Sequence, residues 1–184
     1  MKMRKTLPIL LAAAVVSGAA PAADPMTAAK LYDSQVSTIE SELVPLVQAM
    51  PADKFNFAPA NGEFKGVRTF AQQAKHVAAV IYIVAAAAAK QDKPPVDTGG
   101  ESGPDSVKTK EQIVQFLKDS FAYAHKVTAM ITSQNQLEMV KSPFGSGEVA
   151  RGGVLAVIAW HSFDHYGQMV EYARMNGFIP PASK

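Results

Sequence analysis

Residues 153–176 read GVLAVIAWHSFDHYGQMVEYARMN, and this stretch decides the fold. Its apolar positions recur in alternating steps of four and three, which predicts one long α-helix with a single inward-facing seam. The helix should stop at the Asn-Gly pair that ends it, and two prolines follow shortly after. Polar residues share the seam with apolar ones, and its members are Val154, Ile158, His161, His165, Gln168, Tyr172 and Met175.

Three further helical patterns precede this helix, at about residues 27–50, 69–89 and 109–133. The first has one apolar stripe that contains Pro45, which should kink or restart the helix. The second and third each open on a T-x-x-Q capping box. The second is also apolar on nearly all sides, which is typical of a buried helix.

Two long connections separate these helices. Residues 91–107 are rich in Pro, Gly, Asp and Ser, and we expect a mobile segment there, with plain disorder favoured over a lid. Residues 135–152 form a second loop, and no convincing strand alternation is visible in the chain. Four amphipathic helices without strands predict an all-α protein, a four-helix bundle.

The two histidines of the fourth helix lie four residues apart, so their Cβ atoms should share one face at roughly 5–6 Å. A polar group in a core seam costs roughly 1–3 kcal/mol when it lacks a partner. A divalent cation would satisfy both rings in their neutral form. A metal site normally needs a third ligand. We prefer His76, in the buried second helix, over His125, which lies one step off the third stripe and is interpreted as a surface or rim residue.

The first 22 residues have the pattern of a secretory signal peptide. A basic start precedes a short apolar run and an A-x-A site, which places cleavage after Ala22 and leaves one domain, residues 23–184. Loss of this leader takes the formal net charge from +2 to −1, because it carries three basic residues and no acid. We therefore expect an exported protein, periplasmic or secreted, without nucleic-acid binding or stable membrane insertion after cleavage. The absence of cysteine excludes disulfides, thiolate metal sites and a cysteine nucleophile.

The motifs resemble the DinB/YfiT-like superfamily. Members end in a helix with H-x-x-x-H followed by G-Q, which here reads HSFDHYGQ over residues 161–168. A tail of the type Y-x-R-x-N-G-x-x-P-P follows as YARMNGFIPP, residues 172–181, and the segment FAQQAKH, residues 70–76, matches the family's second-helix histidine. The resemblance implies a four-helix bundle with a divalent metal, commonly nickel or zinc, held by His76, His161 and His165. Many members have arginine where this chain has Tyr166.

Three functions remain open at this point. The first is a metal-dependent enzyme, hydrolase-like or a thiol transferase as in some relatives, acting on a small-molecule substrate at an open coordination position. The second is a non-catalytic metal-binding or stress-related protein, and the third is a helical interaction module in which the histidines only pack. Gln168, one turn beyond His165, would orient a metal-bound water or make a core hydrogen bond. The resemblance also makes a homodimer plausible.

Overall fold

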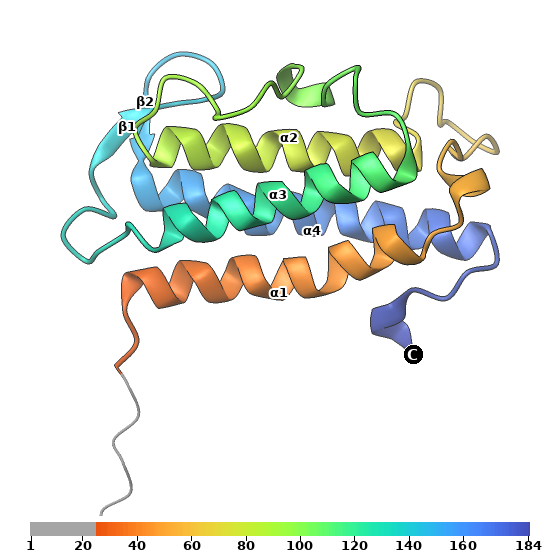
Figure 1. Cartoon of the computed structure of the whole chain (residues 1–184), viewed down its shortest axis with the longest axis horizontal. Helices are drawn as coiled ribbons and strands as arrows, with labels where there is room; N and C mark the ends of the chain where they lie inside the picture. The colour runs from red at the N-terminus through yellow and green to blue at the C-terminus, as the bar shows by residue number, and fades with distance from the viewer. Residues whose placement is uncertain (1–24) are drawn as a thin grey trace, which may run out of the picture.

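The computed structural model of the protein describes residues 25–184 and confirms an all-α four-helix bundle (Figure 1). The predicted leader, residues 1–22, lies outside the described residues. The four long helices are α1 (Ala28–Ala49), α2 (Phe70–Ala88), α3 (Lys110–Thr128) and α4 (Arg151–Met175). Short elements join them: the 3-10 turns η1 (Ala52–Lys54), η2 (Gly100–Ser102) and η3 (Pro181–Ser183), and the strands β1 (Met139–Lys141) and β2 (Glu148–Ala150).

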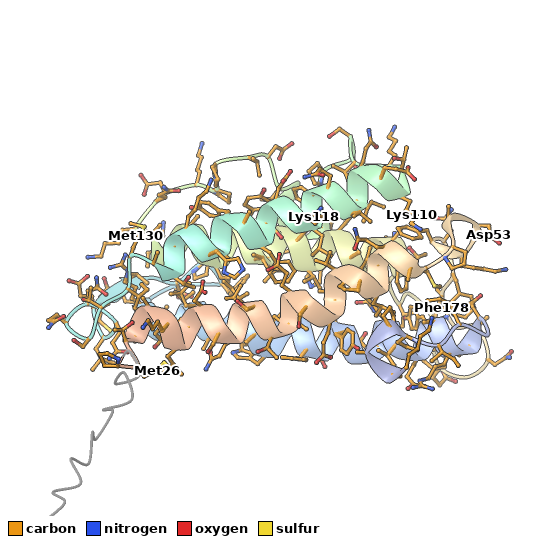
Figure 2. The ribbon with its side chains drawn as sticks, turned by 60° about the horizontal axis from the view of Figure 1, so that its bottom comes forward. Met26, Asp53, Lys110, Lys118, Met130 and Phe178 are labelled. Atoms are coloured by element: carbon orange, nitrogen blue, oxygen red, sulfur yellow. The ribbon has the colours of Figure 1, made fainter. Side chains whose placement is uncertain are left out.

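The helices form a square in which α2 and α1 each pack against both α3 and α4. The Lys110 ammonium at the start of α3 donates to the Met50 carbonyl just beyond the end of α1, at 2.8 Å, so these helices are antiparallel. Figure 2 shows the same relation, with Lys110 and Asp53 at one end of the bundle and Met26 and Met130 at the other. Arg151 Nε, at the start of α4, donates to the carbonyl of Ala88 at the end of α2, at 2.6 Å. The antiparallel α2–α4 pair therefore places the first half of α2 opposite the second half of α4.

Local chemistry starts the helices where the sequence predicts. Thr27 caps α1, and both Thr69–Gln72 and Thr109–Gln112 form complete capping boxes. The apolar stripes of α1 and α3 lie in one core with the interior face of α2. The helix α2 would suit a membrane span by length and apolarity, but 72% of that stretch is buried inside the bundle, as in the core helix of a globular domain.

The seam of α4 drifts away from the predicted positions towards its C-terminus. Val154, Ile158 and His165 are buried as expected, but Gln168 and Met175 are exposed. Met169 and Ala173 are buried instead, along with Tyr172. The reason is geometric: an α-helix has 3.6 residues a turn, so a strict heptad count drifts by about 20° per heptad. Over three heptads, the predicted positions therefore rotate away from the side of α4 that faces the core.

The connection from α2 to α3 is not the disordered segment that we predicted. It runs back along α2 and crosses its first half at η2 (Figure 1). Thr98, Gly103 and Pro104 are buried in this crossing. A Cβ at Gly103, whose φ is +82°, would lie 2.7 Å from Lys75 Cβ. Only glycine therefore lets the connection sit this close to α2.

Of the two outcomes expected at Pro45, the restart does not occur, because α1 continues across this residue as a single helix. Two other local features differ from the sequence-based expectation. β1 and β2 pair as an antiparallel hairpin, whose strands of three residues are too short to show an alternation in the sequence. α3 ends at Thr128 rather than near residue 133. Beyond it, Thr132 and Asn135 bond reciprocally to each other's backbone amides, which favours a turn over a further helical turn.

Candidate metal centre

The antiparallel α2–α4 pair brings His76, His161 and His165 together. One ligand nitrogen from each ring lies within 4.8 Å of the others, and among the described residues this is the one such group of three metal-ligating side chains. The ring centroids are 4.6 to 5.0 Å apart. His76 and His165 are only 5% and 8% exposed, and His161 is half-buried. We call these three residues the triad.

His76 is held by the connection that crosses α2. Its Nδ1–H donates to the backbone carbonyl of Glu101, in η2, at 2.6 Å. A carbonyl can only accept, so this bond places the proton on Nδ1 and leaves the lone pair on Nε2. His76 Nε2 lies 3.1 Å from His161 Nε2, on the side that faces the triad. The sequence did not reveal this contact, because a backbone carbonyl in a loop carries no residue-specific signal.

His165 is held by a chain of side-chain hydrogen bonds. Its Nδ1–H donates to Gln73 Oε1, Gln73 Nε2 donates to Gln168 Oε1 at 2.9 Å, and Gln168 Nε2 donates to Asp164 Oδ2 at 3.1 Å. The carboxylate at the end accepts only, so it sets the direction of every bond before it. Nε2 of His165 is therefore also left with its lone pair. Gln73 was missed from the sequence, although a polar residue in a largely apolar helix, one turn before His76, was a visible signal.

His161 is oriented differently from the other two. Its Nδ1 is buried without a hydrogen-bond partner among the described residues, as is the neighbouring Ser162 Oγ. Contacts with the other rings of the triad therefore set its position, rather than a bond behind the ring. The exposed Trp160 packs edge-on beside it, with ring centroids 6.2 Å apart. His161 is thus the least rigidly held member and the one nearest to solvent.

Burial keeps the triad neutral. It lowers the pKa of His161 and of His165 to about 4, and the charge that the neighbouring imidazoles would carry adds to the effect. The pKa of His76 is also lowered by burial, against the opposing effect of its bond to Glu101. The three rings therefore offer lone pairs at neutral pH without competition from protons.

Two other residues singled out from the sequence lie outside the triad. Both ends of the Gln168 amide are bonded to protein groups, so the structure places it in the chain behind His165. His125 bridges two helices: its Nδ1 lies 2.6 Å from Asp33 Oδ1 and its Nε2 lies 2.9 Å from Glu40 Oε2, both on α1. It is a partly exposed rim residue, as expected, and it takes part in an ion-pair cluster.

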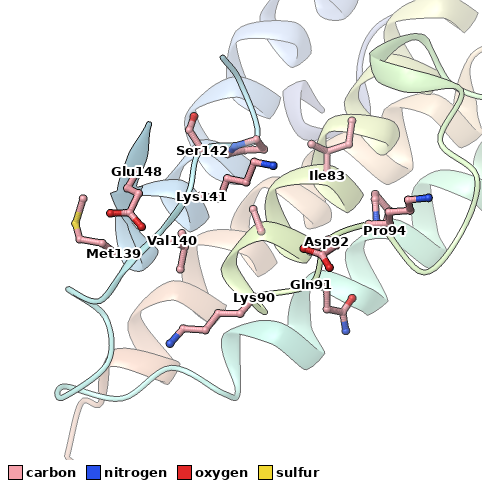
Figure 3. Close-up of a pocket in the computed structure, with 14 residues that line it drawn as sticks. Ile83, Lys90, Gln91, Asp92, Pro94, Met139, Val140, Lys141, Ser142 and Glu148 are labelled. Atoms are coloured by element: carbon pink, nitrogen blue, oxygen red, sulfur yellow. The ribbon is translucent and has the colours of Figure 1, made fainter. Parts of the chain in front are cut away.

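Two pockets lie near these elements. One, of about 470 Å³, lies between the end of α2 and the hairpin, and no member of the triad lines it. Figure 3 shows Lys90 and Asp92 on one side of it and Lys141 and Glu148 on the other. A second, of about 310 Å³, lies at the start of α2 beneath the crossing connection.

The triad has the chemistry of a divalent metal site. Three neutral imidazoles converge, and two of them have the far nitrogen bonded to an oxygen acceptor, the arrangement that orients metal-binding histidines. Three such ligands leave at least one coordination position open on a tetrahedral ion. The group could therefore hold a metal ion.

Comparisons with known proteins agree with this architecture. A DinB-like protein from Bacillus cereus has a TM-score of 0.63 at 13% identity, over 82% of this chain and 93% of the other. A DinB-like protein from Bacillus subtilis has a TM-score of 0.61 at 13% identity, over 80% and 92%. No curated protein matches the sequence. The sequence profile of the DinB superfamily matches residues 35–169, most of the described bundle, and the chain belongs to that superfamily.

Proposed function

We propose that this protein is a metal-dependent enzyme in which His76, His161 and His165 hold one divalent ion, nickel or zinc. The observation that carries the proposal is the convergence of three ligand nitrogens within 4.8 Å. Three facing lone pairs of buried, neutral rings repel one another unless a proton or a cation lies between them. A divalent ion removes that cost and uses all three ligands at once.

The bound ion would lower the pKa of a coordinated water towards about 7, or hold a thiol as its thiolate, and polarise a substrate carbonyl. The chain supplies the orientation. Glu101 holds His76 through its carbonyl, and Gln73 holds His165 through its amide oxygen. His161, half-buried beside the exposed Trp160, lies on the side from which a small molecule would enter. This arrangement supports a hydrolase-like reaction or the transfer of a thiol.

Elemental analysis of the purified protein tests the metal part of the proposal. We expect about one ion per chain in the wild type and a loss of that ion in His165→Ala. The matched control is His125→Ala, which removes a histidine outside the triad and should keep the metal. A wild type without metal, even after incubation with nickel or zinc, would overturn the proposal.

A turnover screen tests the catalytic part. Ester, amide and thiol-transfer substrates would be compared with the metal-loaded protein, the metal-free protein and His165→Ala. We expect turnover only with the loaded wild type and with His125→Ala. A loaded protein that turns over nothing in the screen would leave a metal-binding protein without catalysis, the alternative reading of the same site.

A further inference from the structure

The pocket at the start of α2 has a polar lining that the triad does not use. Its volume is about 310 Å³. The walls come from two segments: the entry and first turns of α2, and the connection that crosses them. The lining residues are Gly66, Arg68, Gln72, Lys75, Ser102, Gly103 and Asp105.

Two cations in this lining lack a counter-ion. No carboxylate among the described residues lies within ion-pair distance of the Arg68 guanidinium or the Lys75 ammonium. Asp105 is the one acidic side chain of the lining, so the pocket walls keep a net positive charge. Two like charges in one pocket repel each other, and a bound anion would relieve that repulsion.

The fold holds the stem of Lys75 and the backbone of Arg68, whose side chain is exposed. The stem of Lys75 is held beneath the connection, where a Cβ at Gly103 would lie 2.9 Å from Lys75 Cε. Arg68 directly precedes the capping residue of α2, and its backbone carbonyl accepts a hydrogen bond from the Tyr172 hydroxyl of α4 at 3.2 Å. The Lys75 stem and the Arg68 backbone therefore have fixed places in the pocket wall, from which both cationic groups can reach a bound anion.

The pocket also adjoins the triad. Lys75 precedes His76 in α2, and Ser102 follows Glu101, whose carbonyl holds His76. The Arg68 charge is close enough to act on all three histidines, because it contributes to lowering the pKa of each. The pocket and the triad therefore share the first turns of α2 and the connection that crosses them.

We propose that this pocket binds a carboxylate of the substrate while the reacting group of the same molecule occupies the open position at the triad. The inference rests on the proposed function and names its substrate class: small molecules with one carboxylate near the reacting group. The planar guanidinium of Arg68 can bond a carboxylate through two parallel N–H groups, and Lys75 adds a second cation. This geometry selects against neutral analogues of the same shape.

The test uses two thiols of equal length with the Co²⁺-loaded mature protein. They are 3-mercaptopropionate and its neutral amide, 3-mercaptopropionamide, and their binding is followed by sulfur-to-cobalt charge-transfer absorption. We expect the carboxylate to bind about tenfold more tightly, the effect of one well-placed charged hydrogen bond. The preference should weaken with added salt. The double variant Arg68→Gln/Lys75→Gln should lose it, whereas Lys118→Gln, an exposed lysine on α3 (Figure 2), should keep it.

Each other outcome is informative. Equal binding of the two thiols by the wild type would overturn the carboxylate subsite and leave the metal site intact. A preference that survives in the double variant, or that falls equally in Lys118→Gln, would also overturn it. Failure of the wild type to develop cobalt bands before any thiol is added would overturn the proposed function, and this inference with it.

Discussion

Gly103→Ala tests whether the connection from α2 to α3 holds His76, a proposed metal ligand, in place. The added methyl group would lie 2.7 Å from Lys75 Cβ, closer than real contacts allow, and 3.2 Å from the Lys75 carbonyl oxygen, a tight contact. Residue 103 also has a φ of +82°, which costs a side chain about 1–3 kcal/mol. The cheapest relief is to lift the connection off α2, which draws the Glu101 carbonyl away from His76 Nδ1.

We expect Gly103→Ala to weaken metal binding by about 10- to 100-fold, the usual effect of losing a group that orients a metal-binding histidine. The matched control is Gly100→Ala in the same connection. It also has a positive φ, +63°, but an added methyl group there meets nothing within 4 Å. It should lose some stability and keep its metal affinity.

Metal affinity would be measured by competition with a chromogenic chelator, and stability by urea unfolding of the metal-free proteins. The reasoning would be refuted if Gly103→Ala and Gly100→Ala both bound the metal as tightly as the wild type. It would also be refuted if both variants lost the same amount of metal affinity, because a shared loss would come from backbone strain rather than from displacement of Glu101.

Other predictions address the residues around the triad and the leader. Gln73→Met keeps the volume of the side chain but removes the acceptor of His165 Nδ1–H, so we expect metal affinity to fall by about 10- to 100-fold with little loss of helix content by circular dichroism. His125→Gln should destabilise the bundle by about 1 kcal/mol, because the bonds of His125 to Asp33 and Glu40 are partly exposed. Burial lowers the pKa of His125, but these two carboxylates raise it more, so it is raised overall. A raised folded-state pKa means that the stabilisation is full below the unfolded-state value of about 6.5 and disappears as pH rises through the folded-state value. Urea unfolding of wild type and variant should therefore differ most in mildly acidic buffer and converge in alkaline buffer; a constant difference would contradict this. N-terminal sequencing of the protein exported by a bacterial host should begin at Ala23, and retention of residues 1–22 would contradict the leader prediction.

The sequence predicted those features that depend on periodicity and capping. Thr69 with Gln72 and Thr109 with Gln112 mark helix starts because their side chains satisfy otherwise unpaired backbone amides. The stripes of α1 and α3 are buried because a short amphipathic helix keeps one face towards the core. His76 was chosen over His125 from burial and from the family resemblance, and the structure brings His76 to the other two histidines.

The remaining features depend on long-range contacts. The contact between Glu101 and His76 depends on a connection whose composition predicts disorder, and a single glycine at position 103 lets it pack. The exposure of Gln168 depends on the difference between 3.6 residues per turn and the 3.5 that a heptad count assumes, which adds up along α4. The ion pairs of His125 join α3 to α1, and no local pattern encodes the rotation of one helix about another.

X-ray absorption spectroscopy of the metal-loaded protein tests the central claim most directly, because it identifies the ligands themselves. The account predicts three imidazole nitrogens at about 2.0–2.1 Å from a bound zinc ion, with one of them lost in His76→Ala. A spectrum of oxygen ligands alone, or one that is the same in the wild type and in His76→Ala, would contradict the assignment of the metal to this triad.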